Sequence, residues 1–414
     1  MFKNTGITLV LAMLTMVGAL GIDAYLPSFP AIITDLQITP LEMQQTLSVY
    51  IAMMAITVLF AGTLSDALGR RPVMLGAMLL FGAASVLAVF ADSLTMLLLA
   101  RALQGVGAGI SMVLSRTVVQ DRFAGAEAQR VMALITMVFS IAPSVAPVIG
   151  GWLQQAFGWH SVFILMAAYA LLLWLLCHRG MPETLPPAQR TPMRLGAIFG
   201  NYGLALRTPR FVLMVLAIGL IFTGIALYIS SASAYLIGIL GLKETDFGWM
   251  FIPLTIGMLA GASIARRLAR KVSPQRLTAL GFTLVLLACI SSVLYTRLAT
   301  PTVPWAVLPL GLYSLGMSIA LPGMTVAALS IFPQMRGLAA SLQSFVQMGF
   351  FSLVSAFIAP HVFHSAEALA WTHLAGVSLG VVLWVLGSRM APPAATPAGM
   401  GPQLAPDMKK PAAR

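Results

Sequence analysis

The chain has 414 residues, of which 59% are apolar and only 9% are charged, whereas about a quarter of the residues of an ordinary soluble domain are charged. So few charges cannot cover the surface of a water-soluble protein of this length, so the sequence excludes a soluble globular fold and predicts a protein surrounded by lipid. The net charge of +12 would suggest nucleic-acid binding in a soluble protein. The two cysteines and five histidines have no metal-ligand spacing, so neither a disulfide framework nor a metal site is expected.

Long apolar runs recur along the whole chain. A helix that crosses the hydrocarbon core needs about 20 mostly apolar residues, because its backbone must satisfy its own hydrogen bonds in lipid. Twelve runs meet this requirement: 7–26, 47–64, 73–90, 94–114, 131–153, 162–177, 211–240, 247–265, 277–295, 303–331, 338–359 and 368–386. The sequence therefore predicts an all-α integral membrane protein with twelve transmembrane helices. The first run has no small-residue cleavage site, so we expect it to be retained.

The positions of the basic residues predict the orientation of these helices, because Lys and Arg accumulate in short cytoplasmic loops. With the N-terminus inside, nearly all of the 24 basic residues fall in the tails, the central loop and the inner hairpins. Lys243 and Arg297 face outside, and Arg101 lies within a helix. The positive charge is thus a topology signal, and nucleic acid is not an expected partner. We expect a multi-pass protein of the bacterial cytoplasmic (inner) membrane with both termini cytoplasmic.

A Pro- and Arg-rich segment, 178–210, divides the runs into six and six. We interpret it as a cytoplasmic linker between two six-helix bundles, 1–177 and 211–388. The Pro/Ala-rich tail 389–414 is expected to be disordered. Residues 23–26 (DAYL) are echoed by 233–236 (SAYL), which favours duplication of a six-helix unit. Parallel repeats of this kind build transporters with a central cavity that opens to alternate sides.

Asp23 and Arg101 are the two charged residues placed within membrane segments. A charge in the bilayer costs free energy, so each is a functional hypothesis. We interpret Asp23 as a proton-exchanging group, because burial favours a neutral carboxyl group and a nearby guanidinium favours a charged one. Two alternatives remain open: a structural ion pair between the two side chains, or a position of Asp23 at the wet outer end of its helix. His373, in the last run, is expected to make an interhelical hydrogen bond rather than to carry a second proton.

Residues 62–71 (GTLSDALGRR) resemble the loop signature that joins helices 2 and 3 of the major facilitator superfamily. The resemblance implies the major facilitator fold, a tight turn that glycines permit, and a charge network that latches the two halves in the outward-facing state. In that network the aspartate meets the positive end of helix 11, here near Gly337. An ordinary positive-inside turn would explain the arginines but not the Gly-x-x-x-Asp-x-x-Gly spacing. By resemblance the latch residues are Gly62, Asp66, Gly69, Arg70 and Asp121.

Three further segments carry the resemblance. Residues 101–107 (RALQGVG) resemble the helix 4 motif whose arginine, here Arg101, is linked to proton transfer. Residues 21–30 (GIDAYLPSFP) are similar to the Bcr/CflA group of drug:proton antiporters, which includes bicyclomycin and chloramphenicol exporters. Residues 142–151 (APSVAPVIGG) resemble the helix 5 motif of antiporters, although the family usually has glycine at Ala146, and a generic kinked helix is the alternative. The motif residues are Pro143, Ala146, Pro147, Gly150 and Gly151.

The resemblance implies a proton-coupled antiporter that exports drugs or other small amphipathic compounds across the membrane. Its partners would be a small drug-like substrate, protons and the lipid bilayer; it would work as a monomer, without a cofactor or a metal. A dedicated exporter of one metabolite or sugar is the alternative. A membrane enzyme or a sensor is disfavoured, because no base and nucleophile pair or metal site is evident at depth. Candidates for the substrate cavity are polar, aromatic or adaptable side chains: Tyr25, Tyr50, Met54, Met112, Phe139, Ser140, Tyr228, Ser233, Gln343 and Gln347.

Overall fold

The computed structural model of the chain describes residues 2–192, 195–269 and 271–390. Every regular element within these ranges is a helix, and twelve of the helical segments are long and apolar enough to cross a bilayer. The all-α, twelve-span fold class predicted from the hydropathy runs is therefore confirmed. The tail predicted to be disordered lies, from residue 391 onward, outside the described residues.

The first six spans follow one another with short connections. They are α1 (Phe2–Asp23), continued by the 3-10 turn η1 (Leu26–Ser28) and α2 (Phe29–Asp35), then α3 (Pro40–Leu68), α4 (Arg70–Val89), α5 (Leu94–Arg122), α6 (Gly125–Phe157) and α7 (His160–Gly180). Two local features show why these helices begin and end where they do. Thr39 and Glu42 form a capping box at the start of α3, and Gly69, with a φ of 103°, permits the one-residue turn between α3 and α4.

The last six spans follow a connecting segment that contains the 3-10 turn η2 (Pro187–Gln189) and helix α8 (Leu195–Leu206). They are α9 (Pro209–Ser230), α10 (Gly248–Leu268), α11 (Pro274–Leu298), α12 (Leu308–Leu329), α13 (Arg336–Leu353), continued by η5 (Val354–Ile358) and α14 (Ala359–Val362), and α15 (Ala366–Arg389). The π-helix η3 (Ala234–Ile239) and the 3-10 turn η4 (Glu244–Phe247) join α9 to α10. Helix α8 was not expected, because the prolines upstream of it led us to interpret the whole segment 178–210 as a linker.

Small residues set how closely the helices approach one another within each group of six. A Cβ atom added to Gly105 of α5 would collide with the backbone oxygen of Tyr50 on α3, and one added to Gly257 of α10 would collide with that of Gly311 on α12. Packing between helices in lipid depends on such close approaches, because apolar side chains gain little by leaving lipid for protein. The glycines therefore bring α5 onto α3 and α12 onto α10 at backbone distance.

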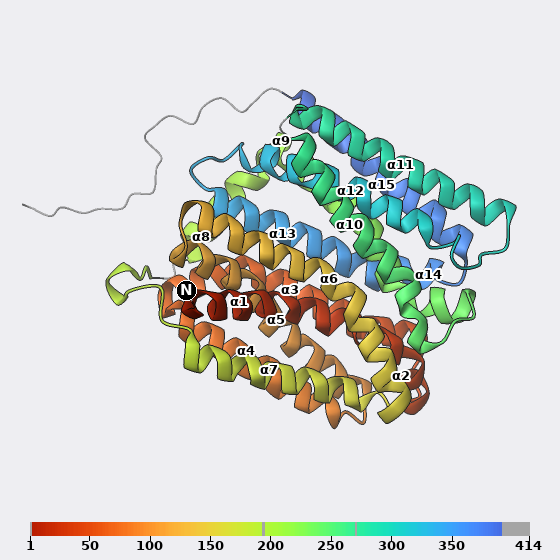
Figure 1. The fold of residues 1–414 in the computed structure, drawn as a ribbon, viewed down its shortest axis with the longest axis horizontal. Helices are drawn as coiled ribbons and strands as arrows, with labels where there is room; N and C mark the ends of the chain where they lie inside the picture. Colours follow the sequence, from red (N-terminus) through yellow and green to blue (C-terminus); the bar gives the residue numbers. More distant parts are fainter. Residues whose placement is uncertain (1, 193–194, 270, 391–414) are drawn as a thin grey trace, which may run out of the picture.

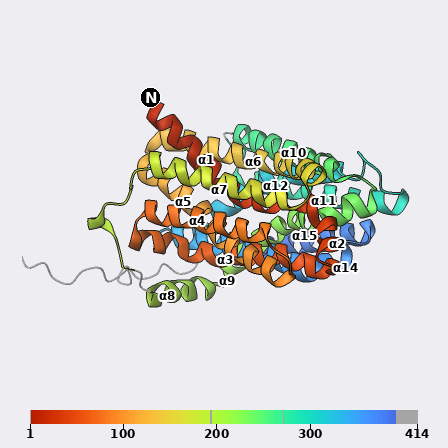
Figure 2. The same cartoon turned by 90° about the horizontal axis from the view of Figure 1, so that it is seen from below.

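The two groups of helices lie side by side (Figure 1). They meet along α3 and α13 and along α6 and α10. The N-terminus and α8 lie at one end of the molecule, and α2 and α14 lie at the other (Figure 1 and Figure 2). We call these the predicted cytoplasmic end and the predicted outer end. The domain limits 1–177, 178–210 and 211–388 stay a prediction.

Candidate functional site

Asp23 is the last residue of α1 and lies inside the protein, with 3% of its surface exposed. Its Oδ1 atom has no hydrogen-bond partner in the described part of the chain. The ion pairs found there do not include Asp23 or Arg101. Both alternatives for Asp23 are therefore wrong in this structure, because it forms no structural ion pair with Arg101 and is not at a wet helix end. A buried carboxylate without a cation costs several kcal/mol, whereas the neutral acid costs far less.

Arg101 is fully buried on α5 and is held by a socket of aromatic rings and carbonyl groups. Its guanidinium lies over the ring of Tyr50, 4.1 Å from the centroid, and over the ring of Tyr25, 4.5 Å from the centroid. Nη2 donates to the backbone oxygen of Gly21 at 2.8 Å, and Nη1 donates to Oε1 of Gln104 at 2.7 Å. The positive charge is thus balanced by ring faces and carbonyl dipoles rather than by a carboxylate.

The socket ties Arg101 to the segment that carries Asp23. Gly21 lies two residues before Asp23 on α1, and the hydroxyl group of Tyr50 donates to the backbone oxygen of Gly18, at 3.1 Å, on the same helix. A Cβ atom at Gly21 would collide with that tyrosine hydroxyl, so the close contact requires glycine. A movement of α1 away from α5 therefore strains or breaks the charge-assisted hydrogen bond from Arg101 to the Gly21 carbonyl, whereas the bond to Gln104 stays within α5.

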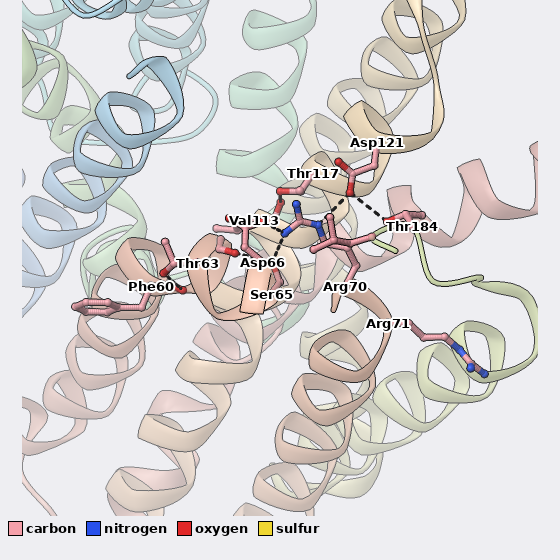
Figure 3. A network of polar contacts seen from close by, with 12 residues as sticks. Phe60, Thr63, Ser65, Asp66, Arg70, Arg71, Val113, Thr117, Asp121 and Thr184 are labelled. Carbon is pink, nitrogen blue, oxygen red and sulfur yellow. Dashed lines mark hydrogen bonds and ion pairs between the residues drawn. The ribbon is translucent and has the colours of Figure 1, made fainter. Parts of the chain in front are cut away.

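The turn between α3 and α4 carries a second charged cluster. Arg70 lies between two carboxylates (Figure 3): Nη1 is 2.5 Å from Oδ1 of Asp66, and Nε is 3.0 Å from Oδ2 of Asp121. Nη1 also donates to Oγ of Ser65 at 2.6 Å. The structure thus brings Asp66, Arg70 and Asp121 together. Gly337 lies across the cavity that Asp66 lines.

Gly62 does not shape this turn, contrary to the expectation from the loop signature. It lies inside α3, and a Cβ atom there would meet no other atom within 4 Å. Gly69 alone has the left-handed backbone that the turn needs. Gly62 instead lines the cavity that also contains Gly337.

Two residues of the connecting segment complete the cluster, and sequence reasoning missed both. The carboxylate of Glu183 accepts hydrogen bonds from the backbone N–H groups of Arg70, at 3.0 Å, and of Arg71, at 3.3 Å, at the start of α4. Thr184 donates to Oδ2 of Asp121 at 3.1 Å. An acidic residue at a helix N-terminus is favoured by the helix dipole. The segment after α7 is therefore fastened to the Asp66, Arg70 and Asp121 cluster.

Replacing Glu183 by glutamine is expected to loosen this segment. The amide carries no charge for the α4 N-terminus or for Arg190, whose Nη2 lies 3.8 Å from the Glu183 carboxylate. A loss of about 1 kcal/mol should raise the rate of tryptic cleavage at Arg190 about fivefold. Glu367→Gln, which removes the ion pair with Arg297 at the predicted outer end, is the control and should leave that rate unchanged. An unchanged rate in Glu183→Gln would show that the cap does not hold the segment.

Helix α6 carries the proposed antiporter motif, and its second half lies against both groups of helices. Pro143 and Pro147 lie inside the helix, and Ala146 is buried. A Cβ atom at Gly150 would collide with the backbone oxygen of Ala24, the residue after Asp23. One at Gly151 would collide with the backbone oxygen of Glu244, ahead of α10. The paired glycines thus let α6 approach the end of α1 on one side and the last six spans on the other.

Uncharged side chains join the two groups at the predicted outer end. Gln44 Nε2 and Ser48 Oγ on α3 donate to Oγ of Ser355 in η5, at 2.8 and 3.0 Å, and Ser352 Oγ donates to the backbone oxygen of Ser48 at 2.9 Å. We call these four residues the outer clasp. On the other side, Ser144 of α6 hydrogen-bonds to Thr255 of α10. These hydrogen bonds therefore join the two groups at this end, beside a cavity of about 450 Å³ that both groups line.

Removing Ser355 from the outer clasp is expected to favour opening of this end. Ser355→Ala leaves the buried amide of Gln44 without its acceptor, whereas Ser48 can still donate to the backbone oxygen of Gln44 at 2.9 Å. The unpaired amide costs the closed arrangement about 1–3 kcal/mol and should lower its population about tenfold. Spin labels at Leu41→Cys and His361→Cys, both exposed at the predicted outer end, report the separation; the native cysteines are buried. Ser291→Ala, whose hydroxyl donates only within α11, is the control. An unchanged distance distribution in Ser355→Ala would show that the outer clasp does not hold this end closed.

At the predicted cytoplasmic end a cavity of about 400 Å³ separates the two groups. Its walls come from α3, the start of α4, α5, α8 and α13 and include Asp66, Met112, Arg116, Gln120 and Ser341. The walls thus combine apolar surface with both signs of charge, as expected of a site that admits amphipathic molecules.

The candidate cavity residues are placed differently from one another. Met112 lines the cavity at the predicted cytoplasmic end, and Ser233 lines another, of about 450 Å³, at the predicted outer end. The remaining candidates are buried or half-buried in the helix packing: Tyr25, Tyr50, Met54, Phe139, Ser140, Tyr228, Gln343 and Gln347. Tyr25 and Tyr50 belong to the Arg101 socket.

His373 differs from expectation. It is buried on α15 against the rings of Tyr313 and Tyr228, with centroids 4.4 and 5.3 Å away. Both ring nitrogens lack a hydrogen-bond partner within the described ranges, so the expected interhelical hydrogen bond is not formed. The hydroxyl group of Tyr313 donates instead to the backbone oxygen of Ile221. Among the described residues there is no group of three or more His, Cys, Asp or Glu side chains that could hold a metal ion.

Comparison with known proteins supports the family resemblance that the loop and helix motifs indicate. The sequence model of the Major Facilitator Superfamily matches residues 11–359. The "Bicyclomycin resistance protein homolog" of Haemophilus influenzae is 28% identical over 385 residues, which cover 91% of this chain and 94% of that protein. The "Multidrug resistance protein MdtL" of Shewanella sp. (strain ANA-3) is 32% identical over 330 residues, 79% of this chain and 82% of that protein. The crystal structure of a D-xylose-proton symporter superimposes with a TM-score of 0.72 at 17% identity, covering 92% of this chain and 97% of that one.

Proposed function

Because the chain belongs to the Major Facilitator Superfamily, we propose that it is a proton-coupled antiporter that exports drugs or other small amphipathic compounds by alternating access. The relatives named for bicyclomycin and multidrug resistance support the substrate class. The observation that carries proton coupling is the buried Asp23 carboxyl group, which has an unpaired oxygen and no ion pair in the described part of the chain.

In this proposal Asp23 carries the proton and Arg101 connects its protonation to helix movement. Loss of the proton places a negative charge close to the Arg101 socket, and the guanidinium can then exchange its bond with the Gly21 carbonyl for one with the carboxylate. That exchange shifts α1 relative to α5. Gly150 passes the shift to α6, which contacts the last six spans.

The proposed cycle begins from the arrangement in this structure. The outer clasp holds the predicted outer end closed, and the substrate enters the cavity between α3, α5 and α13. The Asp66, Arg70 and Asp121 cluster is proposed to meet the start of α13, near Gly337, when this entrance closes. Gly62 of α3 and Gly337 of α13, which line the same cavity, would let the helices approach at that stage.

The chain is a multi-pass membrane protein, with twelve spans among the described residues. We propose that it lies in the bacterial inner membrane with both termini cytoplasmic and that it works as a monomer. In this proposal it is a transporter rather than an enzyme, and the proton gradient drives it without a cofactor. The six-plus-six division, with the linker 178–210 on the cytoplasmic side, belongs to the same proposal.

Transport in everted membrane vesicles tests the proposed function. Energised vesicles that carry the protein should accumulate a fluorescent drug analogue and a bicyclomycin- or chloramphenicol-type antibiotic, and a protonophore should abolish the accumulation. Vesicles from the same cells without the protein are the control. Transport of a single metabolite without transport of any drug would support the dedicated exporter instead, and accumulation that survives the protonophore would refute proton coupling.

A single proton carrier predicts how transport depends on substrate charge. If each cycle moves one proton inward, export of a neutral compound carries one net charge inward, and an inside-negative potential assists it by about 2.3 kcal/mol per 100 mV. Export of a monocation is electroneutral, and export of a dication is opposed by the same amount. Proteoliposomes with a potassium-valinomycin potential and no pH gradient measure this dependence. Potential-assisted export of a dication would contradict a single proton carrier.

A further inference from the structure

A second cavity at the predicted cytoplasmic end lies among the first six spans and is also lined by Met181 and Pro182, directly after α7. It has a volume of about 820 Å³ and shares no lining residue with the cavity between α3, α5 and α13. The start of α1, the start of α4 and the ends of α5 and α7 form its walls. Its charged and titratable lining residues are all basic: Arg71, Arg122, His178 and Arg179.

The remaining walls of this cavity are mostly apolar. Ile7, Val10 and Leu11 of α1 and Leu176 of α7 line it. The apolar surface continues along the outside of both helices. Leu9 of α1 is 56% exposed, and Leu171 and Leu172 of α7 are 56% and 45% exposed. On α7, Leu172 and Leu176 share a helix face with Arg179, because residues three and four positions apart lie one above the other. The cavity thus joins a basic pocket at the predicted membrane surface to an apolar strip that faces lipid.

The arrangement of the arginines suits an anion. Nη2 of Arg71 donates to the backbone oxygen of His178 at 2.7 Å, which fixes this guanidinium in the wall. Its buried Nε has no hydrogen-bond partner among the described residues. Three guanidinium groups line one cavity, so an anion that enters it meets several cations, and the planar fork of arginine matches the oxygens of a phosphate group.

We propose that this cavity binds the headgroup phosphate of an anionic phospholipid from the cytoplasmic leaflet, with the acyl chains along α1 and α7. Basic pockets between helices on the cytoplasmic side attract anionic lipids. The apolar strip favours a lipid over a soluble phosphate, because only a lipid has acyl chains that can lie along it. The Arg71 backbone N–H donates to Glu183, and Arg71 follows Arg70 of the charged cluster. A bound lipid therefore fastens the start of α4 to the end of α7 beside that cluster.

Lipid titration of the purified full-length protein tests this site. The protein in detergent is mixed with phosphatidylglycerol, bound lipid is counted by native mass spectrometry, and the thermal unfolding midpoint is followed in parallel. The variant Arg122→Gln/Arg179→Gln should bind phosphatidylglycerol about 30-fold more weakly than the wild type, a factor of about five for each arginine. The control Arg267→Gln/Arg276→Gln removes the same charge from the predicted cytoplasmic end of the last six spans and should bind as the wild type does.

Three results would overturn the proposal. Equal affinity of the cavity variant and the control would show that the cavity does not hold the lipid. Equal retention of phosphatidylcholine would show that the headgroup charge is not recognised, and equal thermal protection by inorganic phosphate would identify a soluble anion instead. If the double variant does not fold, Arg179→Gln alone should lose about fivefold in affinity, and Arg179→Lys should restore most of it; equal binding by both would be a fourth contradiction.

Discussion

Asp23→Asn is expected to abolish drug accumulation driven by a pH gradient, down to the level of vesicles without the protein. The amide has nearly the shape of the carboxyl group but cannot release a proton, so the proton no longer drives the cycle. Substrate binding should persist, because Asp23 is buried beside the Arg101 socket and is not among the residues that line the cavity between α3, α5 and α13.

The matched control for this prediction is Asp92→Asn. Asp92 is exposed between α4 and α5 at the predicted outer end, so the loss of its charge should leave transport unchanged. Equal expression and equal drug binding of the two variants separate a coupling defect from a folding defect. Accumulation by Asp23→Asn against a gradient at the wild-type rate would remove Asp23 from the mechanism.

Gly151→Ala is expected to shift the protein toward an open outer end. The added Cβ atom would collide with the backbone oxygen of Glu244, and a backbone atom cannot move aside as the tip of a side chain can. Overpacking of this kind costs about 1–3 kcal/mol, which lowers the population of the closed arrangement by about tenfold or more. Separation of α6 from the segment ahead of α10 relieves the collision, so the open arrangement carries no such cost.

The separation between labels at Leu41→Cys and His361→Cys measures this shift, and a longer distance should dominate in Gly151→Ala. Gly76→Ala is the control, because a Cβ atom at Gly76 in α4 would meet nothing within 4 Å. Transport by Gly151→Ala should fall in parallel, since the protein returns less often to the arrangement that loads substrate. If the short distance persists while the variant folds normally, the contact between Gly151 and Glu244 does not control the outer end.

The sequence predicted the features that depend on one helix at a time. Hydropathy runs located the twelve spans because lipid imposes the same length and composition on each of them. The Gly-x-x-x-Asp-x-x-Gly spacing located the charged turn, where the structure pairs Asp66 with Arg70. The breaks inside the spans were not predictable: η3 and η5 insert π-turns into apolar stretches whose composition does not differ from that of a regular helix.

Contacts between distant residues explain the features that the sequence did not predict. Glu183 lies 113 positions after Arg70, and nothing in the local sequence distinguishes it from a solvent-exposed linker acid. The depth of Arg101 suggested a carboxylate partner, yet two tyrosine rings and the Gly21 carbonyl surround its guanidinium. A ring face can stabilise a buried cation without neutralising it, and the order of residues along the chain does not show whether a ring or a carboxylate lies beside Arg101.

Proton release on substrate binding tests whether Asp23 exchanges a proton for the drug. Purified protein in a weakly buffered solution with a pH-sensitive dye is mixed with a neutral substrate, and the protons released per bound substrate are counted for the wild type, Asp23→Asn and Asp92→Asn. We expect release by the wild type and by Asp92→Asn and none by Asp23→Asn. Equal release by Asp23→Asn, with equal substrate binding, would place the exchanged proton on another group.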